Sequence, residues 1–406
     1  MEATLYISYD GMTDQLGQSQ VLPYLIGLSK HGVQVLLISF EKKERFENNR
    51  IVVEEICHKA GIIWYPLMYT KKPPILSTLW DVYQMKKLIW TLHKRYHFSL
   101  THCRSHISAI GGAYLKKRGG VPFIFDMRGF YADERVDGNI WRLSNPLFKM
   151  VYRFFKTKEK EFLLDAAATV SLTLAGKMII NSWNGFQHVP IDVIPCCADQ
   201  NHFNPSNVNM DNVENWFKKL GINRTDLVIT YLGSLGTWYM ADEMFMFFKR
   251  LLQSRPEAKF LLITPDSKDS LLEFSLRHNI PIDSIIVQSA KRSEVPELLL
   301  LGSVSVFFIK PVFSKQASSP VKMGEILAMG IPVIANSGVG DVDYIINDTQ
   351  CGILIKEFTI EEYDKAINQI ESLRQRNKDI YQNASKKYYS LSDGVDRYWQ
   401  IYKRIF

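Results

Sequence analysis

The sequence predicts an α/β protein with two domains, each built on a parallel sheet. The chain has 406 residues, of which 46% are apolar and 22% charged, and this length and composition suit two or three globular domains. Short β-rich runs alternate with longer segments of helical spacing in both halves, which is typical of parallel βα units. A polar, Asn-rich stretch at residues 199–211 separates the halves and is the expected linker.

The N-terminal domain is expected to cover residues 1–200. Its candidate strands are residues 4–9, 33–40, 62–67, 98–102, 123–127 and 168–172. Apolar residues recur at helical spacing at 22–31 and 78–96, between these strands. Strands and helices therefore alternate, as a parallel sheet covered by helices requires.

The C-terminal domain is expected to cover residues 201–385. Its candidate strands are residues 227–232, 259–264, 285–288, 304–309, 332–335 and 352–355. The last segment, 386–406, predicts an amphipathic helix that crosses back onto the first domain. We interpret the chain as two Rossmann-like domains that face each other across a cleft, with ligands outside the carboxyl ends of the strands.

The stretch 318–335 is the most informative part of the second half. It predicts a helix with Ser319 as N-cap, Pro320 at the first helical position and Gly330 at its end. Backbone N–H groups and the positive end of the helix dipole gather near Ser319, and Lys322 lies one turn further on. Glu325 follows at i+3 on the same face. A phosphate and a hydroxyl-bearing ring bound side by side would be a nucleotide.

Glycine-containing loops follow the first strand of each predicted domain. Residues 9–20 include Gly11 and Gly17, but their spacing is not G-x-G-x-x-G. Residues 233–239 include Gly233 and Gly236, which let a backbone approach a ligand closely. A plain turn remains the alternative for both loops. A third glycine loop precedes Asp341, which is the expected N-cap of another helix.

Charged side chains also follow two strands of the N-terminal domain. Arg128, after the strand at 123–127, is placed to steady a phosphate or a developing negative charge. The alternative is a structural ion pair of Arg128 with Asp133 or Glu134. The residues that follow the strand at 98–102 and are candidates for the cleft are His102, Arg104 and His106.

The net charge of +7 is unevenly distributed. Residues 1–200 carry 25 Lys and Arg against 18 Asp and Glu, whereas the remaining residues carry 24 of each. The N-terminal half is therefore expected to meet an anionic partner, such as a membrane surface or a phosphorylated acceptor. A cationic stripe on the helix at 148–160 is one candidate contact for anionic lipid, although a solvated helix face is the commoner explanation. The stripe consists of Lys149, Arg153, Lys156 and Lys160.

Other features narrow the class of protein. The five cysteines are mostly isolated and fit neither a metal knuckle nor a disulfide framework, which favours reduced thiols in the cytoplasm. No N-terminal signal is recognisable, and the longest apolar run, 298–309, is shorter than the roughly 20 residues of a spanning helix. No zinc finger or long basic tract indicates nucleic acid.

The run Pro320-x-Lys322-x-x-Glu325, continued by Leu327-Ala328-x-Gly330-x-Pro332-Val333-Ile334, resembles the signature of the retaining glycosyltransferases of family 4, which have the GT-B fold. The likeness covers nearly the whole chain. It includes the loop with Ser19-Gln20, residues 233–239, Asp341, and residues 193–199 together with Phe203.

The resemblance implies that the second domain binds a nucleotide-sugar and the first domain binds the acceptor. Glu325 would bind the ribose, Lys322 and the helix start at Ser319 the diphosphate, and Gly17 would approach the phosphates from the first domain. The implied donor-binding residues are Gly17, Gly233, Ser234, Gly236, Lys291, Ser318, Ser319, Lys322 and Glu325. Arg128, Lys322 and Glu325 are the implied catalytic residues. Acceptor-side candidates are Arg104, His106 and Glu134.

The mechanism implied by the family uses no evident protein nucleophile. The leaving phosphate takes the proton of the acceptor, and the protein contributes positioning and electrostatics. This scheme requires neither a metal ion nor another cofactor.

This sequence departs from the family pattern at three places. Ala317 replaces a glutamate that faces the donor sugar, so the sugar is not specified. Residues 233–239 lack the family's Arg and Lys and carry Trp238 and Tyr239, so Lys322 and Lys315 would hold more of the phosphate charge. Arg128 replaces the family's histidine before Gly129.

We therefore expect a glycosyltransferase that builds a cell-surface polysaccharide or lipid-linked glycan, in the cytoplasm, with the inner face of the membrane as one location. A nucleotide-sugar epimerase or a sugar phosphorylase of the same fold is the alternative among enzymes. A catalytically silent binding subunit is the alternative outside enzymes, and Ala317 and the missing Arg/Lys pair favour it.

Overall fold

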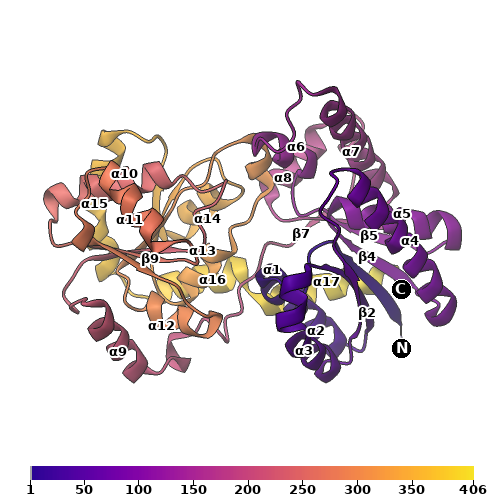
Figure 1. Ribbon diagram of the computed structural model, residues 1–406, viewed down its shortest axis with the longest axis horizontal. Helices are drawn as coiled ribbons and strands as arrows, with labels where there is room; N and C mark the ends of the chain where they lie inside the picture. Colours follow the sequence, from indigo (N-terminus) through magenta and orange to yellow (C-terminus); the bar gives the residue numbers. More distant parts are fainter. Residues whose placement is uncertain (1) are drawn as a thin grey trace. The chain divides into compact units, whose positions relative to one another are not determined.

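The computed structural model describes residues 2–406, which form two compact α/β units (Figure 1). Unit 1 comprises the chain up to Cys196 together with Leu391–Phe406, and unit 2 comprises Cys197–Ser390. The sequence placed this division after residue 200. It also treated 386–406 as one segment, but the structure divides that segment between helix α16 (Asp379–Tyr389) of unit 2 and helix α17 (Leu391–Ile405) of unit 1.

Unit 1 contains a seven-stranded parallel sheet with the strand order β3-β2-β1-β4-β5-β6-β7. Its strands are β1 Ala3–Ser8, β2 Gln34–Glu41, β3 Ile63–Met68, β4 Leu100–Arg104, β5 Phe123–Asp126, β6 Ala168–Ser171 and β7 Ile191–Val193. The sequence missed β7, because a strand of only three residues carries too little pattern to be recognised.

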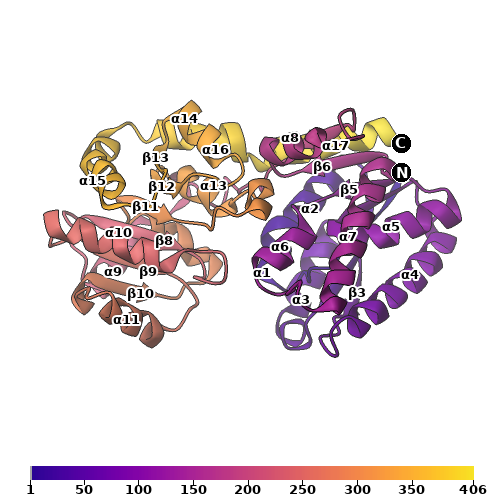
Figure 2. The same cartoon turned by 90° about the horizontal axis from the view of Figure 1, so that it is seen from above.

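The helices of unit 1 cover both faces of this sheet (Figure 2). They are α1 Gln15–Gln20, α2 Leu22–Lys30, α3 Lys43–Lys59, α4 Leu76–Tyr96, α5 Ser105–Gly119, α6 Tyr131–Asp137, α7 Pro146–Asp165, α8 Leu174–Ser182 and α17. The C-terminal helix α17 is anchored to the sheet by two tyrosines. Tyr398 donates to Asp126 Oδ2 at 3.1 Å, and the hydroxyl of Tyr402 lies 2.8 Å from His102 Nδ1.

Unit 2 contains a six-stranded parallel sheet with the order β10-β9-β8-β11-β12-β13. The strands are β8 Val228–Leu232, β9 Lys259–Ile263, β10 Ile285–Gln288, β11 Val304–Phe307, β12 Val333–Asn336 and β13 Gly352–Ile355. The α-helices are α9 Met210–Leu220, α10 Ala241–Ser254, α11 Lys268–Arg277, α12 Val295–Leu299, α13 Val321–Ala328, α14 Val342–Thr349, α15 Ile360–Gln375 and α16. The described residues of this unit also form four short 3₁₀ turns, which are η1 Pro205–Asn207, η2 Ile282–Ser284, η3 Arg292–Glu294 and η4 Phe313–Ala317.

The apolar core of unit 2 explains why its strands read as nearly continuous hydrophobic runs. All residues of β8, β11 and β12 are buried, as expected for parallel strands with helices on both faces. Helix α13 lies within this core, and its close packing depends on Gly324. A Cβ atom there would lie 2.6 Å from the side chain of Tyr389 on α16.

Two helix starts differ from the sequence predictions. The helix expected at residues 22–31 is α2, which has Pro23 in its first turn, but a further short helix, α1, precedes it from Gln15, and Val21 separates the two. Pro23 has no N–H to continue a helix from α1. The second difference is at α13, where Pro320 rather than Ser319 is the N-cap residue.

Candidate functional site

The strand order of unit 2 places a topological switch point between β8 and β11. The chain passes from β8 to β9 and β10 on one side, and then returns to β11 on the other side of β8. In open parallel sheets, ligands bind outside the carboxyl ends of the strands at such a point. The loops that follow β8 and β11 there, residues 233–240 and 308–320, therefore frame the candidate site.

The loop after β8 is held by a carboxylate from the neighbouring strand connection. Asp266, which follows β9, accepts hydrogen bonds from Ser234 Oγ at 2.7 Å and from the backbone N–H of Leu235 at 2.6 Å. The same loop is tied to β11, because the N–H of Lys310 donates to the carbonyl of Trp238 at 3.0 Å. Asp266 was not identified from the sequence, although its position after a strand of the same sheet was a usable signal.

Gly233 permits the close approach of Lys322 to this loop. Gly233 has φ +108°, which disfavours other residues, and a Cβ atom there would lie 3.1 Å from Lys322 Nζ. At Gly236, in contrast, the nearest atom to an added Cβ would be Ser234 Oγ at 3.9 Å. The two glycines predicted to bind the donor thus have different local roles.

Lys322 is a buried cation held between two tyrosines. The residue is only 7% exposed, and Nζ lies 3.7 Å from the ring centroid of Tyr239 and 4.3 Å from that of Tyr231. Nζ also donates to the Tyr231 hydroxyl at 3.2 Å. Burial lowers the pKa of Lys322 to about 7, against the opposing effect of Glu325. An anion bound here would favour the charged form.

Glu325 lies one turn further along α13 and is also buried, with 7% of its surface exposed. Its Oε1 atom lies 3.5 Å from Nη1 of Arg292. Burial raises the pKa of Glu325 to about 7, although Arg292 and Lys322 act in the opposite direction. Lys322 and Glu325 therefore both change charge near neutral pH.

Arg292 was not identified from the sequence, which pointed to its neighbour Lys291. The structure places both residues after the carboxyl end of β10, where η3 begins. The side chain of Lys291 is exposed, and its backbone N–H donates to Glu294 Oε2 at 2.7 Å. Arg292 contacts Glu325 instead and lies over the ring of Phe203 at 5.4 Å. Donor binding by Lys291 stays a prediction.

A second buried lysine pairs with the other aromatic residue of the β8 loop. Lys315 Nζ lies 3.7 Å from the ring centroid of Trp238, and the carbonyl of Lys315 accepts the N–H of Gly340 at 3.0 Å. Trp238 and Tyr239 belong to residues 233–239, the loop in which the family has an Arg and a Lys that this chain lacks. Each covers the ammonium of one lysine supplied by the β11–α13 segment.

The remaining residues of the predicted donor site lie at the start of α13. Ser318 and Ser319 are half-buried, and Ala317 is buried. The N–H of Ser318 donates to the carbonyl of Lys315 at 3.1 Å. The positions that would face the donor sugar therefore offer backbone groups and serine hydroxyls, but no carboxylate.

The third glycine loop, after β12, is organised by a different acid from the predicted one. Asp341 occupies the N-cap position of α14 without a side-chain capping hydrogen bond. Asp343 instead accepts from the N–H of Gly338 at 3.0 Å and from the hydroxyl of Ser337.

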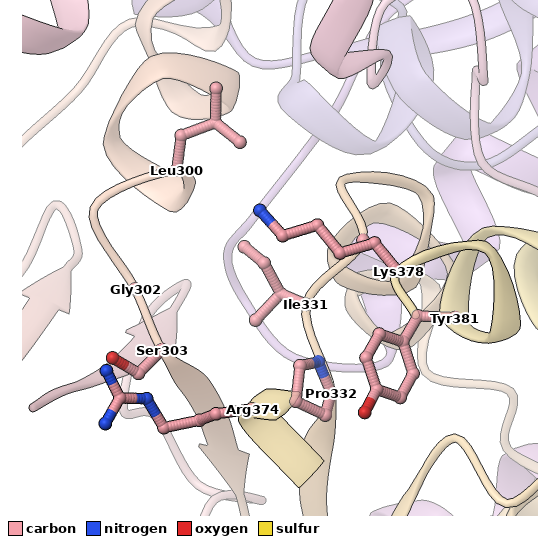
Figure 3. A pocket seen from close by; sticks show the side chains of 9 residues that line it. Leu300, Gly302, Ser303, Ile331, Pro332, Arg374, Lys378 and Tyr381 are labelled. Carbon is pink, nitrogen blue, oxygen red and sulfur yellow. The ribbon is translucent and has the colours of Figure 1, made fainter. Parts of the chain in front are cut away.

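A pocket of about 190 Å³ in unit 2 lies away from this site (Figure 3). It is lined by Gly302 and Ser303, which precede β11, and by Pro332, which precedes β12. Arg374 and Lys378 also line it. Because parallel strands run in one direction, this pocket lies at the amino ends of the strands, opposite to the edge that carries Lys322.

In unit 1, Arg128 contacts two interior side chains. Its Nη2 atom lies 3.0 Å from the sulfur of Cys196, and Nη1 lies 3.7 Å from Asp126 Oδ1. Asp133, one of the expected partners, instead binds Lys156 at 2.8 Å. Arg128 has φ +58°, so its backbone is in the left-handed region while its side chain is largely buried. A catalytic role for Arg128 stays a prediction.

The acceptor-side candidates lie near the carboxyl ends of β4 and β5. Arg104 is buried, with Nε 3.3 Å from Asp10 Oδ2. His106 is fully buried, and its Nε2 atom lies 3.0 Å from Glu159 Oε2. Glu134 is in the first turn of α6 and half-buried. Burial of Arg104 and His106 indicates that they organise unit 1 from within, so direct acceptor contact stays a prediction for all three.

The first glycine loop of unit 1 is built by close packing. A Cβ atom at Gly17 would lie 2.2 Å from the carbonyl oxygen of Gly11. Glu41, buried at the end of β2, accepts the N–H groups of Met12 at 2.8 Å and Thr13 at 3.0 Å. Gly17 is therefore required by the fold of the loop, and its contact with a donor stays a prediction.

The cationic stripe predicted on α7 is interrupted. Lys156 lies 2.8 Å from Asp133 Oδ2 and 2.5 Å from Glu159 Oε1, so its charge is neutralised within unit 1. Lys149, Arg153 and Lys160 are exposed. The sequence pattern placed four cations on one face, but only the tertiary contacts separate Lys156 from the others.

Neither a metal-binding cluster nor a membrane-spanning helix is found in the described part of the chain. Among residues 2–406, no cluster of three or more His, Cys, Asp and Glu side chains is arranged to hold a metal ion. Within the same residues, no helix has the length and apolar character needed to cross a bilayer.

Profiles of known families match both units. The profile of the glycosyl transferases group 1 matches residues 212–387, and that of glycosyltransferase family 4 matches residues 21–202. No curated protein matches the sequence.

Solved structures share the fold of the whole chain. A glycosyltransferase from Rickettsia africae superimposes with a TM-score of 0.71 at 16% identity, covering 100% of this chain and 98% of that one. HepE from Anabaena, solved with UDP and glucose, superimposes with a TM-score of 0.70 at 13% identity, covering 98% of this chain and 99% of that one. The UDP-GlcNAc 2-epimerase from Neisseria meningitidis superimposes with a TM-score of 0.61 at 10% identity, covering 100% of both chains. The predicted GT-B fold is thereby confirmed.

Proposed function

The chain belongs to the glycosyltransferases of the family 4 type, and we propose that it transfers a sugar from a nucleotide-sugar to a glycan or lipid-linked acceptor with retention of configuration. One observation carries this proposal: Lys322 and Glu325 lie one turn apart on α13, both buried, beside the loop of Gly233 at the switch point. A buried cation suits a diphosphate and a neighbouring carboxylate suits ribose hydroxyls, so this pair can serve the two parts of a nucleotide side by side.

Unit 2 would hold the donor. Lys322 binds the diphosphate together with Lys315, and Ser318 and Ser319 contribute hydrogen bonds near the start of α13. Glu325, oriented by Arg292 at 3.5 Å, accepts hydrogen bonds from the ribose hydroxyls. Among the solved structures with this fold, HepE was obtained in complex with UDP-glucose, which supports a nucleotide-sugar as the donor class.

The transfer step exchanges one C–O bond for another. The bond between the anomeric carbon and the donor phosphate breaks, and the acceptor hydroxyl oxygen forms the new bond on the same face of the sugar. The acceptor proton passes to the leaving phosphate oxygen, which Lys322 helps to neutralise. The protein therefore contributes positioning and electrostatic stabilisation rather than a nucleophile. This scheme assigns no role to a metal ion, so added chelator should leave the rate unchanged.

Unit 1 would bind the acceptor at the carboxyl ends of β4 and β5, near Arg104, His106 and Glu134. Arg128 would act there indirectly, by fixing Asp126 and Cys196. We also propose that α7 touches anionic lipid through Lys149, Arg153 and Lys160, next to the exposed side chains of Met150 and Phe154. This arrangement suits a lipid-linked acceptor and the synthesis of a surface polysaccharide.

A donor screen tests this function. Calorimetric titration of the full chain with UDP-, GDP- and ADP-sugars should identify one nucleotide class that binds, and Glu325→Ala should weaken that binding while leaving the chain folded. NMR of the product formed with an acceptor mixture should show the anomeric configuration of the donor. Unchanged affinity in a destabilised Glu325→Ala protein would show that Glu325 is structural.

An epimerase is the second candidate, because the Neisseria 2-epimerase shares this fold. Incubation with donor alone separates the two functions. Conversion of the sugar at C2 without acceptor would contradict the transferase. A folded chain that binds no nucleotide-sugar at millimolar concentration would instead be a silent subunit.

A further inference from the structure

The positive charge of the N-terminal half is concentrated on α4 and α5. Residues 69–125, which include both helices, contain ten Lys and Arg residues and a single acid, Asp81. Asp81 is buried and accepts the hydroxyl of Tyr9 at 2.7 Å, so it presents no charge to the surface. Neither the donor site nor the stripe on α7 uses this charge.

Most of these cations are exposed on two adjacent helices. Figures 1 and 2 both show α4 and α5 side by side in unit 1. The exposed cations are Lys87, Lys94 and Arg95 on α4, Lys116, Lys117 and Arg118 on α5, and Lys71 and Lys72 in the segment before α4. Arg118 also connects the helices, since its guanidinium lies 4.1 Å from the ring centroid of Trp90 on α4.

The first turns of α4 carry an exposed apolar face, which follows Lys71 and Lys72 in the chain and lies on the same side of the helix as Lys87. Leu76, Leu79, Trp80 and Tyr83 are 63%, 59%, 53% and 57% exposed. Their spacing of i, i+3, i+4 and i+7 puts them on one side of the helix. The opposite side, including Met85 and Ile89, is buried in unit 1. More than half of each of the four large side chains is therefore left in contact with water.

We propose that this surface, formed by Lys71 and Lys72, the start of α4 and the exposed cations of α4 and α5, docks on an anionic lipid bilayer. Leucine side chains suit the acyl boundary, Trp80 and Tyr83 suit the headgroup region, and the lysines suit anionic headgroups. Nucleic acid would be met by the cations alone and would leave Leu76 and Leu79 exposed. The surface belongs to unit 1 and does not depend on the donor reaction.

Sedimentation of the full chain with vesicles tests the proposal. The protein should bind vesicles that contain phosphatidylglycerol, bind phosphatidylcholine vesicles weakly, and be released by salt. Leu79→Ser/Trp80→Ser and, separately, Lys71→Glu/Lys72→Glu should each reduce partitioning about tenfold or more. Donor titration of the same variants should be unchanged, so failure of this proposal is distinguishable from failure of the donor site.

A matched control lies on α3. Ile51 and Val52 are 79% and 52% exposed, but their helix also carries Glu47, Glu54 and Glu55. Ile51→Ser/Val52→Ser should not alter vesicle binding. Lys149→Glu/Arg153→Glu measures the separate contribution of α7.

Three outcomes would overturn the proposal. The first is absence of vesicle binding by the folded chain, and the second is binding that the α4 variants leave intact. The third is another occupant: a dimer in light scattering that Leu79→Ser/Trp80→Ser dissociates, or tighter binding to duplex DNA or RNA than to vesicles.

Discussion

The ammonium of Lys322 lies 3.7 Å from the ring centroid of Tyr239, and Lys315 repeats the same distance to Trp238. The aromatic residues that follow β8 thus hold two lysines that come from the β11–α13 segment. A cation over an aromatic face is stabilised electrostatically, most strongly where it is desolvated. Both cations therefore come from the β11–α13 segment, and the β8 loop supplies the aromatic faces that hold them.

Replacing the ring of Tyr239 tests this pairing. Tyr239→Leu keeps an apolar side chain but removes the negative face of the ring, so donor affinity should fall by about 5- to 30-fold, in keeping with a cation–π contribution of roughly 1–2 kcal/mol. Calorimetric titration measures the change. Tyr344→Leu, at an exposed tyrosine of α14, is the control and should bind the donor normally.

Removing the cation should separate function from stability. Lys322→Met should abolish measurable donor binding but raise the melting temperature, because the buried ammonium is costly. The pKa of Lys322 is lowered to about 7 from 10.5, so its cost is fully present below pH 7 and disappears as the pH rises towards 10.5. The gain in melting temperature should therefore be larger at pH 6 than at pH 9. An equal gain at both pH values would contradict the buried charge.

Donor binding should be accompanied by proton uptake. Above pH 7 a growing fraction of Lys322 is neutral in the free protein, and a bound diphosphate favours its protonation. Affinity should fall as the pH rises from 7 to 9. Calorimetry in buffers of different ionisation enthalpy, at about pH 8, should show uptake in the wild type. The Tyr239→Leu protein, if it binds, provides a comparison with an altered lysine environment.

The stability cost of burying Glu325 has the opposite pH dependence to that of Lys322. Its pKa is raised from 4.5 to about 7, so the cost of its buried charge is absent below pH 4.5 and fully present above pH 7. Glu325→Gln should therefore be more stable, relative to the wild type, at pH 8 than at pH 5, while binding the donor more weakly. Thermal unfolding across this range measures the difference. A relative stability independent of pH would show that the carboxylate is not buried as described.

Gly233 and Gly236 form a matched pair for testing the β8 loop. Gly233→Ala places a Cβ atom 3.1 Å from Lys322 Nζ at a positive φ, so it should cost about 1–3 kcal/mol of unfolding free energy and weaken donor binding. Gly236→Ala meets no atom closer than 3.9 Å and should change stability by less than about 1 kcal/mol. Denaturant unfolding compares the two variants. Equal effects would mean that Gly233 has no special role.

Local patterns in the sequence predicted most of the fold. Alternation of apolar strands and helices placed twelve of the thirteen strands described in residues 2–406, and Gly330 with Pro332 marked the passage from α13 to β12. These features depend on periodicity and on backbone preferences that neighbouring residues set. Strand β7 was missed because three residues carry too little pattern.

The sequence by itself determined the α/β class, the family and the pair Lys322 and Glu325, because each depends on patterns or motifs of residues that are close together in the chain. Only the tertiary structure decided what surrounds that pair. Asp266 and Arg292 reach the site from β9 and β10, and Trp238 and Tyr239 reach it from β8, since the strand order brings these loops to one edge. Tertiary contacts in unit 1 likewise bring Arg128 to Cys196 and Lys156 to Asp133, which spacing along the chain did not reveal.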